Sequence, residues 1–295
     1  MKRHPDYRRS GGPDSFKKFI NREKALIDRE LKRCISKNGK YPEIMYKAIE
    51  HALFPGGKRI RPVLTLLTAE MFGVKSEEVL PTACGIELIH NYSLIHDDLP
   101  SMDNDKYRRG KLTVHCKYGE CVAVLAGDAL LTEAFRLFVL NSRKHGISEK
   151  SVLEVIKVVS QASGLEGMIG GQTADTILSS RRHVNRNLLD YVYTKKTAAL
   201  IEVSVISGAI LSRAKPDEIK SLKRYGQCIG LAFQIVDDIF DLDKGKLTYP
   251  AVYGMEKSRD RAGRLIDRAK KSLELFGRNA YMLNKLADYV INRKN

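Results

Sequence analysis

Long stretches with helical periodicity dominate this 295-residue chain, and they limit the folds open to it more than any other feature. Apolar residues recur every three or four positions, whereas few segments alternate as strands do. The expected helices are one around Leu26, Leu31 and Ile35, then 44–53, 61–71, 81–99, 123–140, 151–176, 188–211, 216–242, 259–276 and 283–293. Long helices joined by short polar turns predict an all-α fold, a single large helical bundle with its functional site between facing helices.

The composition indicates a globular protein with an anionic partner. Hydrophobic residues make up 43% of the chain, which is enough for a sizeable core. Lys and Arg number 51 against 35 Asp and Glu, a net charge of +16, which suits a nucleic acid, a membrane surface or a phosphorylated small molecule. We expect no nucleic acid, because the basic residues are not interleaved with aromatic ones and no known DNA- or RNA-binding motif follows them.

Domain organisation and location can also be predicted. Turn-forming residues at 10–15 separate a mobile basic leader, residues 1–15, from a helical domain, residues 16–295. The five cysteines are odd in number and form no Cys-x-x-Cys pair, which fits a reduced, cytoplasmic protein. No apolar run approaches 18 residues and the N-terminus has no apolar signal segment, so we expect no membrane span.

Two clusters of aspartates each close an apolar helix. They consist of Asp97, Asp98 and Asp103, and of Asp237, Asp238 and Asp241. Asp237 and Asp241 lie one helical turn apart on one face, where like charges repel and the helix dipole is unfavourable. A chain that assembles such a cluster twice needs cations. Carboxylate oxygens favour magnesium or manganese, and magnesium is readily shared with substrate phosphates.

Pro100 should end the first of these helices near Leu99, so that Asp103 returns from a short loop. Basic groups that could meet phosphate lie elsewhere in the chain, at Lys58, Arg59 and Arg61, at Arg108, Arg109 and Lys111, and at Lys195 and Lys196. Arginine binds phosphate through two N–H groups and lysine through a point charge. Together, the acidic and basic clusters predict a substrate that carries diphosphate and magnesium.

The motifs that carry a family resemblance are GGKRIRP, ELIHNYSLIHDDLPSMDND, RRG, LAGDALL, GGQTAD, KKTAAL, GLAFQIVDDIFD and KLTYPA. In this order they resemble the trans-isoprenyl diphosphate synthases, most closely the bacterial-type farnesyl diphosphate synthases. The resemblance covers about residues 17–295 and implies a helical bundle around a deep central cavity, of the isoprenoid synthase type, usually as a homodimer. It also implies head-to-tail condensation of isopentenyl diphosphate with dimethylallyl and then geranyl diphosphate, giving farnesyl diphosphate and inorganic diphosphate.

The resemblance implies a role for each matching residue. Magnesium, three ions per active site and replaceable by manganese, would be bound or supported by Asp97, Asp98, Asp103, Asp237, Asp238 and Asp241. The diphosphates of the two substrates would contact Lys58, Arg61, His90, Arg108, Arg109 and Lys246. The reacting centre would be lined by Lys196, Thr197 and Gln234. Gln172 and Asp175 share a helix face, for which a supporting and a catalytic role stay equally open.

Product length should depend on side chains below the first aspartate cluster. Tyr92 lies five residues before Asp97, so its Cα is roughly 7.5 Å further down the helix axis. By resemblance an aromatic side chain there forms the floor of the cavity, and with Ser93 beside it the pattern is that of a farnesyl diphosphate synthase. His90, Ser93 and Asp97 share one helix face, which favours a functional His90 over a histidine buried in the core.

One segment departs from the family pattern. The loop from Asp241 to Lys246 is about a dozen residues shorter than usual for such active-site loops. Either the loop is truly short, or a mobile lid is missing from the sequence as it stands. The short loop leaves open an inactive regulatory subunit of a heteromeric synthase. A geranylgeranyl diphosphate synthase is the alternative within the same chemistry, with Tyr92 as the discriminating residue.

Overall fold

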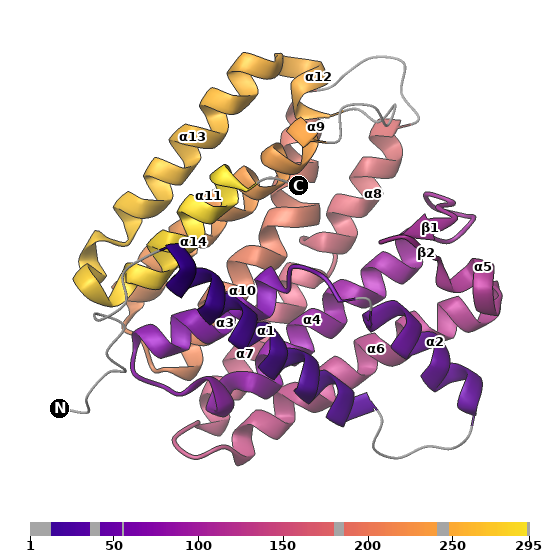
Figure 1. Cartoon of the computed structure of the whole chain (residues 1–295), viewed down its shortest axis with the longest axis horizontal. Coiled ribbons are helices and arrows are strands. Elements are labelled where there is room, and N and C mark those ends of the chain that lie inside the picture. The colour runs from indigo at the N-terminus through magenta and orange to yellow at the C-terminus, as the bar shows by residue number, and fades with distance from the viewer. Residues whose placement is uncertain (1–12, 36–41, 55, 180–185, 241–247, 294–295) are drawn as a thin grey trace.

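The protein is almost entirely helical in a computed structural model that describes residues 13–35, 42–54, 56–179, 186–240 and 248–293 (Figure 1). The helices are α1 (Pro13–Ile35), α2 (Glu43–Leu53), α3 (Ile60–Met71), α4 (Ser76–Asp97), α5 (Val114–Tyr118), α6 (Glu120–Leu140), η2 (Asn141–Arg143), α7 (Glu149–Ser163), α8 (Met168–Ser179), α9 (Arg186–Val192), η3 (Tyr193–Ala198), α10 (Ala199–Leu211), α11 (Pro216–Phe240), α12 (Tyr249–Tyr253), α13 (Met255–Ser272), η4 (Glu274–Ala280) and α14 (Tyr281–Asn292). The strands β1 (Tyr107–Arg108) and β2 (Lys111–Leu112) form a small antiparallel hairpin. The predicted all-α fold is confirmed.

Helices α3, α4 and α10 form the interior of the bundle, and most of their residues are buried. Helix α4 packs against α3 and α6, while α10 packs against α3 and α11. A Cβ on Gly208 of α10 would lie 2.4 Å from the carbonyl oxygen of Thr65, so only glycine fits there. The Thr65 hydroxyl also donates to the Ser204 carbonyl at 2.9 Å. Helices α3 and α10 therefore meet nearly backbone to backbone.

Helix α4 starts at Ser76, earlier than predicted, and runs through Pro81. The side-chain amide of the buried Asn141 accepts from the Thr82 N–H at 3.0 Å and donates to the Glu78 carbonyl at 2.6 Å. An unbroken helix would pair these two backbone groups with each other. Asn141 therefore bridges an opened turn beside the proline, and α4 continues to the first aspartate cluster.

Two predicted helices are interrupted. The segment 151–176 forms α7 and α8, because the chain turns back so tightly between them that a Cβ on Gly167 would lie 2.0 Å from the Ala162 carbonyl oxygen. The segment 188–211 contains η3, a π-helical turn between α9 and α10. Such turns are frequent at functional sites. Figure 1 shows α8, α9 and α12 gathered at one end of the bundle, above α4 and α10.

Candidate active site

A cavity of about 1200 Å³ lies between α3, α4, α8, η3 and α11. It brings together residues that the sequence placed in separate motifs. Those that line it are Lys58, Arg61, His90, Tyr92, Ser93, Asp97, Arg108, Arg109, Lys196, Thr197, Gln234 and Asp237. The predicted residues Asp98, Asp103 and Asp238 are described but do not line it, while Asp241 and Lys246 lie outside the described residues.

The first aspartate cluster has the predicted geometry. Helix α4 ends at Asp97, just before Pro100, and the chain turns back so that the Asp103 N–H donates to the Asp97 carbonyl at 2.9 Å. Burial, together with the nearby charge of Asp103, raises the pKa of Asp97 to about 6, although Lys196 opposes this shift. The charged form of Asp97 is therefore unfavourable in the protein alone, as expected of a carboxylate that requires a cation.

Asp98 points away from the cavity and is almost fully buried. Its carboxylate accepts two hydrogen bonds from Nε of Arg108, at 2.7 and 2.9 Å. Arg108 also lies 3.5 Å from Asp105 and lines the cavity itself. The second aspartate of this motif thus holds an arginine at the mouth of the cavity.

In the second cluster, Asp237 and Asp238 face different surroundings. Asp237 lines the cavity, lies 2.5 Å from a guanidinium nitrogen of Arg293 and is 3.8 Å from Nζ of Lys58. Arg293 is itself buried and stacks over the Phe233 ring, 4.1 Å from its centroid. No sequence pattern singles out Arg293, because it is one of several basic residues near the end of the chain. Asp238 is buried and faces η3.

Two of the residues predicted to line the reacting centre, Lys196 and Thr197, lie in the π-helical turn η3. Nζ of Lys196 lies 2.6 Å from Asp175 of α8, and the Thr197 hydroxyl donates to Oε1 of Gln234 at 2.9 Å. A Cβ on Gly171 of α8 would lie 2.2 Å from the Lys196 backbone nitrogen, so glycine is required for this approach. The two neighbouring motifs GGQTAD and KKTAAL therefore touch through backbone, and Asp175 restrains Lys196.

Arg61 and Arg109 form a second cationic region in the cavity, beside His90. Nε of Arg61 is buried and has no hydrogen-bond partner within the part of the chain that the structure describes. Burial, followed by the charges of Arg61 and Arg109, holds the pKa of His90 well below its usual value, so this imidazole is neutral at pH 7. Arg109 donates to the Gly56 carbonyl. An unpartnered buried donor between other donors is a suitable place for an anion.

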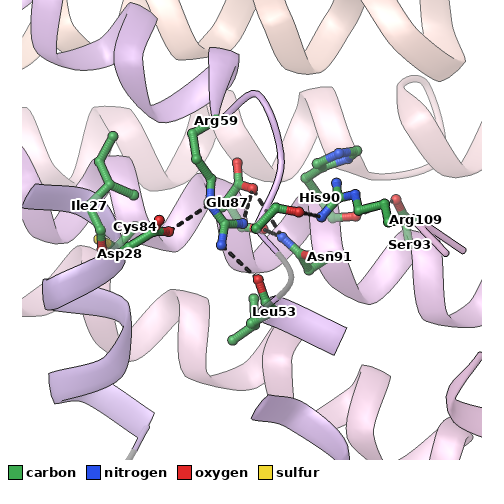
Figure 2. Close-up of polar contacts among 11 residues, drawn as sticks. Ile27, Asp28, Leu53, Arg59, Cys84, Glu87, His90, Asn91, Ser93 and Arg109 are labelled. Carbon is green, nitrogen blue, oxygen red and sulfur yellow. Dashed lines mark hydrogen bonds and ion pairs between the residues drawn. The ribbon is translucent and has the colours of Figure 1, made fainter. Parts of the chain in front are cut away.

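Arg59, which the sequence grouped with Lys58 and Arg61 as a phosphate-binding cation, also borders the cavity, but it is almost fully buried and its guanidinium is bonded to protein groups (Figure 2). Its guanidinium donates to Glu87 at 2.7 Å, to Asp28 at 2.9 Å and to the Leu53 carbonyl at 2.7 Å. The signal for this pairing is Glu87, a lone carboxylate within an apolar helix, because a buried charge needs a partner.

The donor set suits a magnesium ion that is shared with a substrate. Asp97 and Asp103 offer carboxylates at the end of α4, and Asp237 offers one in the last turn of α11. Within the described residues, no three His, Cys, Asp or Glu side chains converge closely enough to hold an ion by themselves. Magnesium characteristically keeps several waters and takes phosphate oxygens as further ligands, so a site of few carboxylates fits it.

Comparison with known proteins identifies the family. Residues 42–281 match the sequence model described as polyprenyl synthetase. The chain belongs to the polyprenyl synthetase family. Dimethylallyltranstransferase of Fischerella ambigua (strain UTEX 1903) is 41% identical, over 93% of this chain and 83% of that protein. Geranylgeranyl diphosphate synthase of Cyanophora paradoxa is 39% identical, over 94% and 96% of the two chains.

A solved structure supports the same assignment. The apo crystal structure of an FPP/GFPP synthase from Zymomonas mobilis superposes with a TM-score of 0.88 at 37% identity, covering 94% of this chain and 99% of that one. The predicted family and its isoprenoid synthase fold are thereby confirmed. None of the described helices combines the length and apolar character that a membrane crossing requires.

The buried ion pair can be tested by Arg59→Met. This change leaves Glu87 charged and buried, so we expect the free energy of unfolding to fall by about 3–5 kcal/mol, measured by urea denaturation. Arg33→Met is the matched control, because Arg33 pairs with Glu30 on the surface and its loss should cost under about 1 kcal/mol. Equal losses in the two variants would contradict the role assigned to Arg59.

The raised pKa of Asp97 predicts a pH-dependent gain from Asp97→Asn. The pKa is about 6 in the folded protein against an ordinary value of 3.8, so the folded chain binds this proton more tightly than the unfolded chain. The charge therefore destabilises the fold above pH 6, and this effect disappears as the pH falls from 6 to about 4. Each pKa unit corresponds to about 1.4 kcal/mol, so at pH 8 the variant should gain up to about 3 kcal/mol.

This gain is measured by urea denaturation with EDTA at a series of pH values. Asp267→Asn, on the exposed face of α13, is the control and should show no such gain. A stabilisation by Asp97→Asn that is the same at pH 4 and pH 8 would refute the explanation from burial.

Proposed function

We propose that this protein is a trans-prenyltransferase that condenses isopentenyl diphosphate with allylic diphosphates. One observation carries the proposal: a single cavity is lined by carboxylates of both aspartate clusters and by two separate groups of cations. Two diphosphates, one of them with bound magnesium, need this arrangement. Membership of the polyprenyl synthetase family supports the same reaction.

In this proposal the allylic diphosphate lies between the two aspartate clusters. Asp97, Asp103 and Asp237 bind magnesium, which manganese can replace, while Asp98 and Asp238 support them by holding neighbouring groups. Asp241 and Lys246, beyond the described residues, complete this set by resemblance. Bound magnesium would supply Lewis-acid stabilisation of the departing diphosphate. Arg108 and Lys196 add positive charge from the protein, which favours breaking of the carbon–oxygen bond.

The second diphosphate, that of isopentenyl diphosphate, is assigned to Lys58, Arg61, His90 and Arg109. With Arg61 and Arg109 as charged donors and His90 as a neutral one, these groups hold the double bond against the allylic carbon. After the new carbon–carbon bond forms, a proton leaves, and the departing diphosphate is the base at hand. Oxygens of Thr197 and Gln234 line the cavity where the allylic cation forms and stabilise it by their dipoles.

Farnesyl diphosphate is the proposed product, because Tyr92 lies in α4 below Asp97 and lines the cavity. Its ring packs edge-on against His96, with centroids 5.8 Å apart, which holds the ring in place. Geranylgeranyl diphosphate is the second candidate, since several relatives carry that name. The homodimer and the cytoplasmic location remain predictions from the sequence.

The proposal is tested by incubating purified full-length protein with magnesium, dimethylallyl diphosphate and radiolabelled isopentenyl diphosphate. We expect magnesium-dependent formation of a C15 alcohol after dephosphorylation, and no product when EDTA is added. A C20 alcohol would support the second candidate. A folded protein that gives no product under these conditions would overturn the proposal and favour an inactive regulatory subunit.

Product length is tested by Tyr92→Ala. The Tyr92 hydroxyl has no hydrogen-bond partner among the described residues, so its removal leaves no buried group unpaired. We expect most of the product to lengthen by at least one five-carbon unit, because the floor of the cavity is opened. Tyr281→Ala, at an exposed position of α14, should leave the product unchanged. An unaltered chain-length profile in Tyr92→Ala would show that the floor lies elsewhere.

A further inference from the structure

Tyr193, the first residue of the π-helical turn η3, connects three separate elements. Its hydroxyl donates to Oδ2 of Asp238 in α11 and accepts from the Tyr249 N–H of α12 at 2.8 Å. The same Tyr249 N–H lies 2.8 Å from Oδ2 of Asp238. Tyr193 and Asp238 are both buried, and neither lines the cavity. A role in the reaction would therefore have to act through other residues.

The other oxygen of Asp238 leads to the reacting centre. Nε2 of Gln234 donates to Oδ1 of Asp238 at 2.9 Å, and Oε1 of Gln234 accepts from the Thr197 hydroxyl at 2.9 Å. Gln234 and Asp238 are four residues apart, so they share one face of α11. A continuous chain of hydrogen bonds thus runs from Tyr193 through Asp238 and Gln234 to Thr197.

This chain fixes which atoms of Gln234 and Thr197 can meet a substrate. A carboxylate only accepts hydrogen bonds, so Asp238 binds the NH₂ group of Gln234 and leaves its carbonyl oxygen on the side of Thr197. The Thr197 hydroxyl donates its proton to this carbonyl oxygen of Gln234. Oxygen lone pairs of Thr197 and Gln234 therefore remain for the cavity, and the NH₂ group of Gln234 is held on the side of Asp238. A forming carbocation is stabilised by lone pairs and repelled by donors.

We propose that Tyr193 is a positioning residue for ionisation: with Asp238 it fixes the orientation of Gln234, so that oxygen lone pairs face the forming allylic cation. This inference rests on the proposed prenyltransferase activity. It also gives Asp238 a role other than metal binding, because both of its oxygens already accept hydrogen bonds from Tyr193, Gln234 and Tyr249.

Close packing supports the rigidity that such a role needs. A Cβ on Gly230 of α11 would lie 2.6 Å from Cα of Ala198, the last residue of η3. The ring of Tyr193 also packs against that of Tyr249, with centroids 5.6 Å apart. The backbone of η3 and the ring of Tyr193 are thus held on two sides, and the hydroxyl position is determined by the fold.

The test is Tyr193→Phe, which keeps the ring and removes the hydroxyl. We expect kcat to fall about tenfold, because a hydrogen bond to the Asp238 carboxylate is lost and the side-chain amide of Gln234 can then rotate by half a turn. The KM values for both substrates should stay within about threefold, since the cation forms only after binding. Tyr253→Phe is the matched control: its ring lies 4.4 Å from that of Tyr249, and kcat should not change.

A double-mutant cycle shows whether Tyr193 acts through Gln234. In a Gln234→Leu background, Tyr193→Phe should have almost no further effect on kcat, because the group that it orients is gone. Fully additive losses would overturn the inference, as would equal kcat values for Tyr193→Phe and Tyr253→Phe. An inactive wild-type chain would instead overturn the proposed function, and the inference with it.

Asp238→Asn is a second variant, for use if Tyr193→Phe does not fold. The introduced amide can donate, so Gln234 can turn its oxygen toward it, and kcat should again fall about tenfold. Binding of Mn²⁺, followed by electron paramagnetic resonance, should keep its affinity within about twofold. A large loss of Mn²⁺ affinity would mean that Asp238 serves the metal and would overturn the positioning role.

Discussion

The ion pair between Arg59 and Glu87 is the interaction on which the arrangement of the cavity depends. Both side chains are buried, and Arg59 adopts a left-handed backbone conformation, with φ at 50°, to reach the core. Such strain persists only where the surroundings compensate it, here through three hydrogen bonds from one guanidinium. Arg59 is held by protein carboxylates just before α3 begins, and this anchors the segment that presents its neighbours Lys58 and Arg61 to the cavity.

The aspartates divide in the same way between side chains that line the cavity and side chains that are bonded within the protein. Asp97 and Asp237 line the cavity, while the residue after each, Asp98 or Asp238, is buried and bonded to protein groups. Adjacent residues of a helix point about 100° apart, so a pair of aspartates cannot present both carboxylates to one ion in the same way. One member of each pair remains for the cavity, and the other bonds to a second side chain that lines it, Arg108 or Gln234.

Much of this could be predicted from the sequence. Periodicity predicts most of the helices, and Pro100 correctly predicts the end of α4. The position of each aspartate cluster at the end of an apolar helix predicts metal binding, and the family resemblance implies that the two clusters share one site. The features that periodicity did not predict depend on close backbone approaches and on tertiary contacts. The break between α7 and α8 is a tight local turn at Gly167, while the π-helical turn packs against Gly171 and Arg59 pairs with Glu87, and hydrophobic periodicity reports none of these contacts.

The residues that were missed are also those that organise the site. Tyr193 and Arg293 carry no motif signal, yet they contact Asp238 and Asp237, the two aspartates that begin the second cluster. Many of the motif residues line the cavity. A supporting contact to such a residue can be made by several types of side chain that carry the same hydrogen-bond donor. The contact that Tyr193 makes with Asp238 requires only a hydroxyl group at one position, and that position is determined by α11 and η3 together. The types of residue that line the cavity can thus be predicted from the sequence, whereas the exact positions of their side chains depend on packing by residues outside the motifs.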